Sequence, residues 1–181
     1  MIRSKVKAVS LSNKHTIRKF NRSYINIIEG YGVEGDAHAG KKVKHRYIAK
    51  KDPDRPNFRQ VHLISIEIYE ELRQNGFAIE PGDMGENICT EGLDIMNLPV
   101  DTILKIGQEV ELQITGMREP CSLLNHIENG LMKATISKNG DGKLIRKAGI
   151  MSIVLKGGIV TPEDPIELVY PPKPFRAMTT I

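Results

Sequence analysis

The chain carries its apolar residues in short runs that end at Gly, Pro or Asp. These frequent turn residues limit the folds that the chain can adopt. Its 181 residues include 16 Gly and 10 Pro, which interrupt both strands and helices. Within the runs, β-branched residues alternate with polar ones, as in half-buried strands. We expect strands at residues 6–12, 61–66, 101–107, 109–115, 149–155 and 165–170. The pair that flanks Gly107-Gln108 predicts a hairpin.

Helical periodicity is confined to two segments. Residues 65–77 place Ile68 and Leu72 at helical spacing and end near a glycine, a typical helix stop. Residues 122–134 carry a weaker apolar stripe, which Gly130 interrupts. Many short strands with about two short helices predict a mainly β fold, a closed or nearly closed β-barrel.

Composition indicates a single domain in a reducing compartment. Aromatic residues make up 5% of the chain and Trp is absent, so the core must consist of Ile, Leu, Val and Met. We assign residues 1–170 to one domain and residues 171–181 to a C-terminal extension. The first residues lack the apolar region of a secretory signal, and no run is long enough to span a membrane. With two cysteines and no CxxC spacing, we expect a cytoplasmic protein with reduced thiols and no membrane attachment.

Cys121 lies in Arg-Glu-Pro-Cys, between a predicted strand and a predicted helix. Pro120 forces a turn, and the helix would point its unpaired N–H groups at the thiol. That helix start and the charge of Arg118 favour a thiolate, whereas Glu119 would oppose it. A thiolate suits sulfur transfer, redox exchange or soft-metal binding. The alternative is a small buried core residue, the role that we favour for Cys89, which has no basic neighbour in its predicted strand.

Polar residues that follow glycine-rich turns are further candidates. Gly35, Asp36 and His38 form a tight segment that suits a metal, a phosphate or a ring nitrogen, or is simply a turn. Two ligands are too few for zinc. His62 or His38 is a candidate to approach Cys121 in space. Asn87 ends a Pro-Gly-Asp turn and either braces a site or caps the next strand.

Residues 41–59 concentrate positive charge, with eight Lys or Arg and two Asp in a chain whose formal net charge is +4. Such a cluster suits phosphate-bearing ligands or nucleic acid, or is only a solvated loop. Tyr47 and Phe58 are its only large aromatic side chains. Because nucleic-acid sites usually contain more stacking surfaces, this composition disfavours nucleic acid.

Five segments, in their order and spacing, resemble one family. They are GVEGDAHAG (32–40), RQVHLISIE (59–67), PGDMGENICTEGLDI (81–95), LPVDTILKIGQEVELQITGMREPC (98–121) and RKAGIMSIVLKGGIV (146–160). Together they are similar to a stand-alone MOSC domain, named for the C-terminal domain of molybdenum cofactor sulfurases. The resemblance covers about residues 5–170, and so implies a single MOSC domain.

The resemblance implies a β-barrel in which Cys121 carries sulfur as a persulfide or coordinates molybdenum. The activity would be sulfur-transferase-like, or a molybdenum-dependent reduction of N-hydroxylated compounds. The cofactor would be a molybdenum-pterin. The residues expected to bind or enclose it are Arg118, Gly35, Asp36, His38, Arg59, His62 and Asn87.

The resemblance also implies partners. The sequence has no pyridoxal-phosphate-dependent desulfurase domain, so we expect a separate cysteine desulfurase as sulfur donor, or an electron-donor protein for the reductase role. The oligomeric state is not predicted. A competing hypothesis is a non-catalytic module that escorts the molybdenum cofactor, or another anionic ligand, with the basic segment 41–59.

Overall fold

The fold is mainly β, as the short apolar runs predict. The structure, a computed structural model, describes residues 4–181. Strands β1 to β13 span Lys5–Leu11, Phe20–Arg22, Ile25–Ile28, Gly32–Val33, Val61–Ser65, Ile88–Glu91, Ile103–Ile106, Val110–Met117, Ile136–Lys138, Leu144–Arg146, Ile150–Lys156, Gly158–Val160 and Ile166–Val169. Helices α1 to α3 span Arg46–Lys51, Ile66–Gln74 and Leu131–Ala134, and the 3-10 turns η1 and η2 span Ile95–Asn97 and Ser122–His126.

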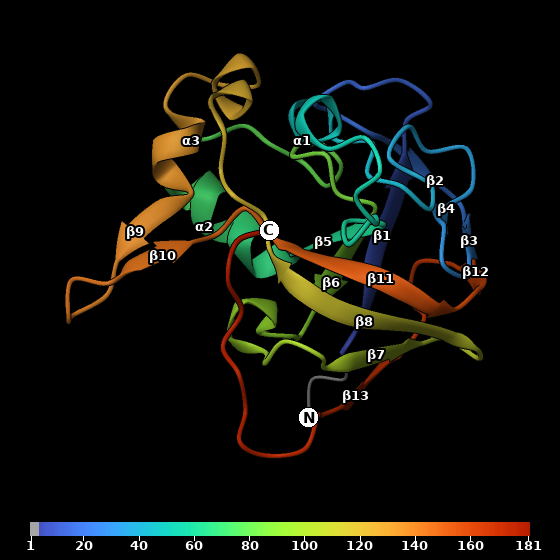
Figure 1. Cartoon of the computed structure of the whole chain (residues 1–181). Coiled ribbons are helices and arrows are strands. Elements are labelled where there is room, and N and C mark those ends of the chain that lie inside the picture. The colour runs from blue at the N-terminus through green and yellow to red at the C-terminus, as the bar shows by residue number, and fades with distance from the viewer. Residues whose placement is uncertain (1–3) are drawn as a thin grey trace.

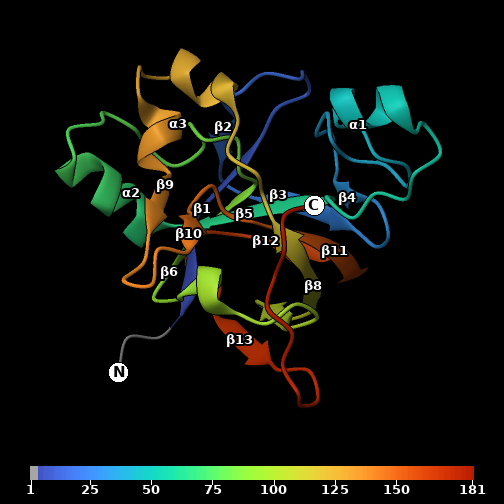
Figure 2. The same ribbon diagram turned by 60° about the vertical axis from the view of Figure 1, so that its left-hand side comes forward.

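Eight strands form one sheet in the order β13-β7-β8-β11-β5-β6-β1-β2 (Figure 1). The predicted hairpin is confirmed, because β7 and β8 are antiparallel neighbours with Ile106 opposite Val110. β5 and β6 run parallel, so the chain crosses over through α2 between them. A three-stranded sheet, β12-β3-β4, lies beside the large one. The β9–β10 hairpin projects from the body (Figures 1 and 2).

No closed barrel is present in the part of the chain that the structure describes, so the barrel prediction is not confirmed. The sheet edges do approach each other, because the amide of Ile166 donates to the carbonyl of Ser4 at 2.8 Å. Val6 also donates to the carbonyl of Asp164 at 2.9 Å and accepts from the amide of Glu163 at 2.8 Å, but Lys5 opposite Pro165 is an isolated bridge and not part of a continuous ladder. Pro165 has no amide hydrogen with which to extend a ladder, and the sheet therefore remains open there.

The core is aliphatic, as the composition requires, and is built from Ile, Leu and Val with Met178. In β1 the strict alternation of buried and exposed side chains that is expected of a half-buried strand is broken. Val6 and Val9 are the fully buried apolar residues. The register against β6 shifts between Val6 and Ala8, and such a bulge turns the following side chains to the other face.

One of the two predicted helices is confirmed and the other is wrong. α2 buries Ile68, Tyr69 and Leu72, as its spacing predicts. Residues 122–134 form only η2 and, later, the four-residue α3. Gly130 separates the two with φ of 86°, a left-handed conformation that ends a helix.

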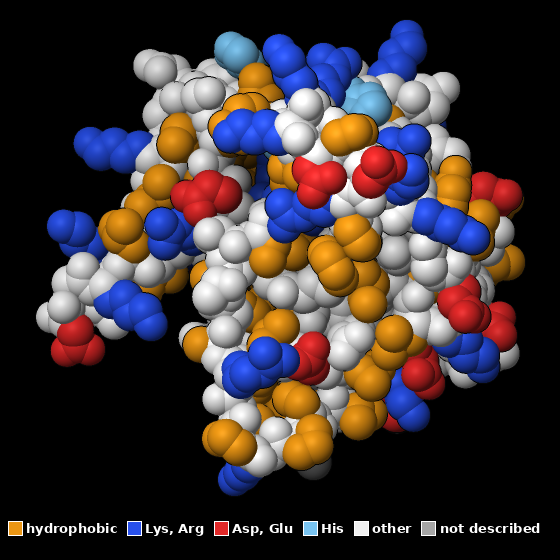
Figure 3. All heavy atoms as spheres, viewed as in Figure 1, with side chains coloured by type: hydrophobic (Ala, Val, Ile, Leu, Met, Phe, Trp, Pro, Cys, Tyr) orange, Lys and Arg blue, Asp and Glu red, His pale blue; other side chains and the backbone are white. Residues whose placement is uncertain are grey.

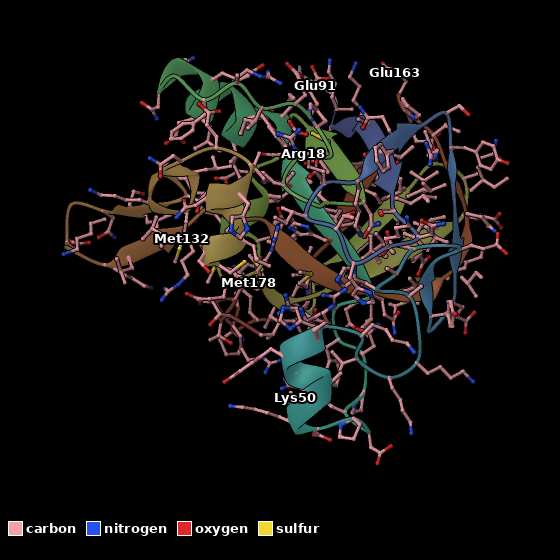
Figure 4. The ribbon with its side chains drawn as sticks, turned by 90° about the horizontal axis from the view of Figure 1, so that it is seen from above. Arg18, Lys50, Glu91, Met132, Glu163 and Met178 are labelled. Atoms are coloured by element: carbon pink, nitrogen blue, oxygen red, sulfur yellow. The ribbon has the colours of Figure 1, made fainter. Side chains whose placement is uncertain are left out.

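α1 lies in the basic segment and was not predicted. It has no buried residue, so no apolar periodicity marks it in the sequence. Figure 4 shows α1, with Lys50, at the rim of the molecule. Among residues 4–181, no helix has the length and apolar character needed to cross a membrane.

The C-terminal segment is better packed than the Pro-rich sequence suggests. The amide of Met117 donates to the carbonyl of Thr179 at 2.8 Å, and that of Ile181 donates to the carbonyl of Met117 at 3.2 Å. A Cβ at Gly116 would lie 2.6 Å from the Thr179 oxygen, so glycine is required at this close approach. The segment therefore ends beside the last residues of β8.

Candidate functional site

Asn87 is the centre of a buried hydrogen-bond network. Its side chain is enclosed between β1, β5 and the 32–40 loop, and the residue is 1% exposed. Its Nδ2 donates to the Ser10 carbonyl at 3.2 Å and to Asp36 Oδ2 at 3.1 Å. Its Oδ1 accepts from the amide of His62 at 3.2 Å. One amide thus fixes the Asp36 loop relative to β1 and β5.

Asp36 forms a buried ion pair with Lys19, whose Nζ lies 2.8 Å from Asp36 Oδ2. The carboxylate also accepts from the amides of Ser12 at 3.2 Å and His38 at 2.9 Å. Burial acts to raise the pKa of Asp36, but the hydrogen bond with His38 and the charge of Lys19 hold this pKa well below its usual range. Asp36 is therefore charged at neutral pH. Nothing in the sequence distinguishes Lys19, which lies between β1 and β2, from a surface lysine.

His62, on β5, is 5% exposed and lies against the strand connection at Gly149. Its Nε2 donates to the Ala148 carbonyl at 2.8 Å. A Cβ at Gly149 would lie 2.6 Å from that same Nε2 and 2.3 Å from the Leu63 oxygen, and φ is +92°, so only glycine fits here. Burial lowers the pKa of His62 well below its usual value, and the imidazole is neutral at pH 7.

The free energy of unfolding is expected to fall as the pH is lowered below about 6.5, where unfolded histidines gain a proton. Burial also lowers the pKa of His38 and His45, so all three imidazoles bind protons more readily in the unfolded chain. Their stabilising contribution is complete above pH ~6.5 and is lost below it, by up to about 1.4 kcal/mol per pH unit for a group whose folded-state pKa lies well below that range, as for His62 and His45. Urea unfolding between about pH 7.5 and about pH 5 measures the slope. His62→Gln should flatten it, and an unchanged slope would contradict this assignment.

Cys121 directly follows the turn after β8, and its side chain is partly exposed. The predicted α-helix beside it is not present, because η2 is a 3-10 turn of only five residues, too short to build up the dipole of a longer α-helix. The positive charge comes from arginines. The charges of Arg118 and Arg59 both interact with the Cys121 sulfur. Glu119 does not oppose them, since it pairs with Arg146 at 3.1 Å.

The charge of Arg118 acts on several ionisable groups around it. Burial lowers its own pKa, and its charge contributes to lowering the pKa of Lys19, His45 and His62. Its guanidinium donates to the Met84 carbonyl. Arg118 therefore interacts by charge with the thiol, with Lys19, the ion-pair partner of Asp36, and with His62 on β5.

Arg59 and Arg118 together leave positive charge unbalanced beside the thiol. Burial and the charge of Arg118 lower the pKa of Arg59 to about 10. Within residues 4–181, neither guanidinium forms an ion pair with an Asp or Glu side chain. Arg59 donates to the backbone carbonyl of Ile181. The buried Glu86 carboxylate offsets part of the charge of Arg118, and the two guanidiniums together keep an excess of positive charge that suits an anion.

His45 belongs to this group and was missed in the sequence, where it is one more polar residue in a basic segment. Burial, then the charge of Arg59, lower its pKa to about 4, so it is neutral at pH 7. Its Nδ1 is buried and has no hydrogen-bond partner in the described part of the chain. A buried polar atom of this kind is normally satisfied, so it is available to a ligand.

The remaining predicted residues have other roles or lie apart. Gly35 has φ of 78° with open space around it, and gives the turn that leads into Asp36. Cys89 is buried in β6, where burial raises its pKa, consistent with a structural thiol. Among residues 4–181, no cluster of three His, Cys, Asp or Glu could hold a metal ion.

A cavity of about 980 Å³ lies away from the thiol, between α2, η1, the β9–β10 hairpin and the C-terminal segment. In the space-filling view, the hairpin stands away from the body on this side (Figure 3). Met117 and Arg146 line the cavity, but Cys121, Arg59 and Arg118 do not. We therefore place the chemistry at the arginines and not in the larger hollow.

A protein-family model described as the MOSC domain matches residues 35–167, and so contains Cys121 and both arginines. The chain belongs to the MOSC domain family. Solved structures agree with this assignment of the fold. The YuaD protein from Bacillus subtilis superposes with a TM-score of 0.74 at 21% identity, over 92% of this chain and 96% of that one. YiiM from Geobacillus stearothermophilus gives 0.62 at 20% identity, over 92% and 75%.

A curated relative of the MOSC chain is a protein named "Reductase" from Gibberella moniliformis (strain M3125 / FGSC 7600). The two are 29% identical over 148 residues, which is 79% of this chain. This chain spans only 23% of the length of that protein. The likeness links the MOSC domain to a reductase, while most of that protein lies outside the matched region.

Proposed function

We propose that this MOSC protein uses Cys121 as a reactive thiol that carries sulfur for the molybdenum cofactor. The observation that supports the proposal is the pair of arginines beside a partly exposed thiol, without an Asp or Glu ion-pair partner in residues 4–181. Such an environment stabilises a thiolate and its persulfide, both of which are anions.

The carrier reaction needs a donor that holds sulfur as a persulfide, and a cysteine desulfurase is the class that supplies one. The Cys121 thiolate attacks the terminal sulfur of the donor's persulfide, forming a new S–S bond. The donor's own S–S bond breaks, and its cysteine leaves as a thiolate that takes a proton from water. Arg118 and Arg59 stabilise the negative charge before and after the transfer, so the persulfide on Cys121 persists until an acceptor takes the sulfur.

The residues present fit an anionic molybdenum cofactor. Arg59 and Arg118 would hold its anionic groups, and the unpartnered Nδ1 of His45 would donate to it or accept a hydrogen bond from it. Cys121 would provide a soft thiolate, the ligand type that suits such a metal. When bound, the cofactor would supply a metal centre that accepts sulfur or exchanges electrons. The chain's own residues would bind it and orient it.

A second function follows from the curated relative named a reductase. Here Cys121 would ligate molybdenum, and an electron-donor protein would replace the desulfurase. Metal analysis distinguishes the two roles. Stoichiometric molybdenum that is lost in Cys121→Ser supports ligation, whereas a persulfide without bound metal supports carriage.

The carrier role predicts that a desulfurase supplied with isotopically labelled cysteine transfers labelled sulfur to the protein. Labelling should be lost in Cys121→Ser and retained in Cys89→Ser, because Cys89 is buried and uncharged. Persulfides are read by mass spectrometry as an addition of about 32 Da. Equal labelling of Cys121→Ser and the unaltered protein would exclude Cys121 as the carrier.

A further inference from the structure

The β9–β10 hairpin has a free edge that borders the cavity of about 980 Å³. Five consecutive residues, Lys143 to Lys147, line this cavity from the second strand of the hairpin, whereas no residue of β9 does. Successive side chains of a strand point to opposite faces, so consecutive residues share a backbone edge and not a face. The cavity therefore lies along the edge of β10 that is turned away from β9.

Two residues on this edge have backbone groups that β9 does not use. The amide of Asn139 donates to the carbonyl of Lys143 at 2.9 Å, and β9 and β10 pair without a register shift. Hydrogen-bonding residues recur at every second position of an antiparallel pair, so the odd-numbered residues of β10 bond β9. Leu144 and Arg146 then direct their N–H and C=O groups toward the cavity. Among residues 4–181, no other strand or loop pairs with these four groups.

The cavity also offers apolar surface beside the edge. Leu144 and Ile145 of β10 are 45% and 36% exposed. Leu93, Leu98 and Met178 line the side of the cavity that belongs to the body of the protein. An extended polypeptide paired with β10 would satisfy the free backbone groups and cover apolar surface with every second side chain.

We propose that this edge is a docking site for an extended acidic segment of a partner protein, which would add a third strand to the hairpin. Residues 136–147 contain four Lys or Arg and one Asp, a net charge of +3 (4 − 1). Arg146 and Lys147 pair with carboxylates of the body. Lys138 and Lys143 have no ion pair within residues 4–181, and acidic side chains on the added strand would balance their charge.

The carboxylates on the opposite wall are engaged by neighbouring groups. Glu67 accepts from the amide of Gly92 at 2.7 Å, and Asp94 accepts from the side-chain amide of Asn97 at 2.7 Å. The uncompensated charge along β10 is therefore positive.

This charge favours an acidic partner over a second copy of the chain. Pairing two copies of β10 would bring together two hairpins that each carry a net charge of +3. Like charges across a ladder are destabilising, and lysines at a free edge commonly prevent such pairing. Cys121 does not line the cavity, so the inference does not depend on sulfur chemistry.

The probe is a fluorescently labelled peptide of about six residues in which glutamate and valine alternate, long enough to span the edge from residue 143 to 147. Fluorescence anisotropy with the full chain should show saturable binding that weakens as salt is added. Bound peptide should also slow hydrogen exchange at the amides of Leu144 and Arg146, measured by NMR. A peptide with lysine in place of glutamate, and one whose amides are all N-methylated, should not bind.

Two proline variants compare the edges of the hairpin. Leu144→Pro removes an N–H group that faces the cavity and none that bonds β9, and should weaken binding at least about tenfold. Lys138→Pro removes an amide on the outer edge of β9 and one surface charge, and should weaken binding on the order of threefold or less. Cys121→Ser should bind like the unaltered chain. Thermal unfolding verifies that each variant is folded.

Three results would overturn the inference. The first is the absence of saturable binding of the acidic peptide up to about 1 mM. The second is binding that Leu144→Pro and Lys138→Pro weaken equally, or that the N-methylated or lysine peptide matches. The third is a dimer of the chain alone, seen by sedimentation and dissociated by Leu144→Pro, which would assign the edge to a second copy.

Discussion

Replacing Lys19 with methionine is expected to lower the free energy of unfolding by about 3–5 kcal/mol, the usual cost of removing one partner from a buried ion pair. The Lys19 and Asp36 side chains are 4% and 2% exposed, so the remaining carboxylate could not recover its hydration. Methionine keeps most of the volume of lysine, which separates the loss of charge from the loss of packing. Urea unfolding at neutral pH measures the change.

A double variant supplies the control. Asp36→Asn removes the charge that Lys19→Met would leave unpaired, so the double variant should be more stable than the sum of the two single changes predicts. Simple additivity would show that Lys19 and Asp36 do not interact energetically. It would also contradict the view that the ion pair holds Asp36 in the position where the His38 amide and Asn87 donate to it.

Replacing Arg118 with methionine is expected to slow alkylation of Cys121 by iodoacetamide at neutral pH on the order of tenfold, because an adjacent positive charge favours the reactive thiolate. Removing Arg59 as well should bring the loss to roughly a hundredfold, since both charges interact with the sulfur. Peptide-resolved mass spectrometry over time measures the rate at Cys121 alone.

The matched variant is Arg118→Lys, which keeps the charge but not the planar fork. It should retain most of the alkylation rate, while its thermal unfolding reports any structural damage. If Arg118→Met alkylates at the rate of the unaltered protein and is equally stable, the arginine does not activate the thiol. The basis for sulfur chemistry at Cys121 would then be lost.

Local pattern in the sequence is enough to predict β1, β5, β6, β7, β8, β11 and β13, but not β2, β3, β4, β9, β10 and β12. The β7–β8 hairpin and α2 follow from periodicity and turn residues that act within a few positions. Closure of the barrel does not follow, because it depends on how β13 meets β1 far along the chain, where Pro165 limits the ladder. α1 could not be predicted either, since it buries no residue and shows no apolar stripe.

Some residues of the candidate site can likewise be predicted from the sequence, and others cannot. Arg118 and Cys121 are three positions apart, so their proximity can be inferred from the sequence. Arg59 comes near the thiol, and His45 near Arg59, only through the fold of the basic segment. Lys19 is buried by a loop that has no distinguishing composition. Burial and unpaired charge are tertiary properties, and they decide which of the many basic residues face Cys121.

The central claim is that sulfur resides on Cys121, and the most direct test is peptide-resolved mass spectrometry of the protein isolated without reductant from the cells that make it. The account predicts an addition of about 32 Da on the Cys121 peptide, removed by reductant, and an unmodified Cys89 peptide. A sulfur adduct on Cys89, or a bare Cys121 thiol in protein whose Cys121→Ser variant still supports sulfur transfer in those cells, would contradict it.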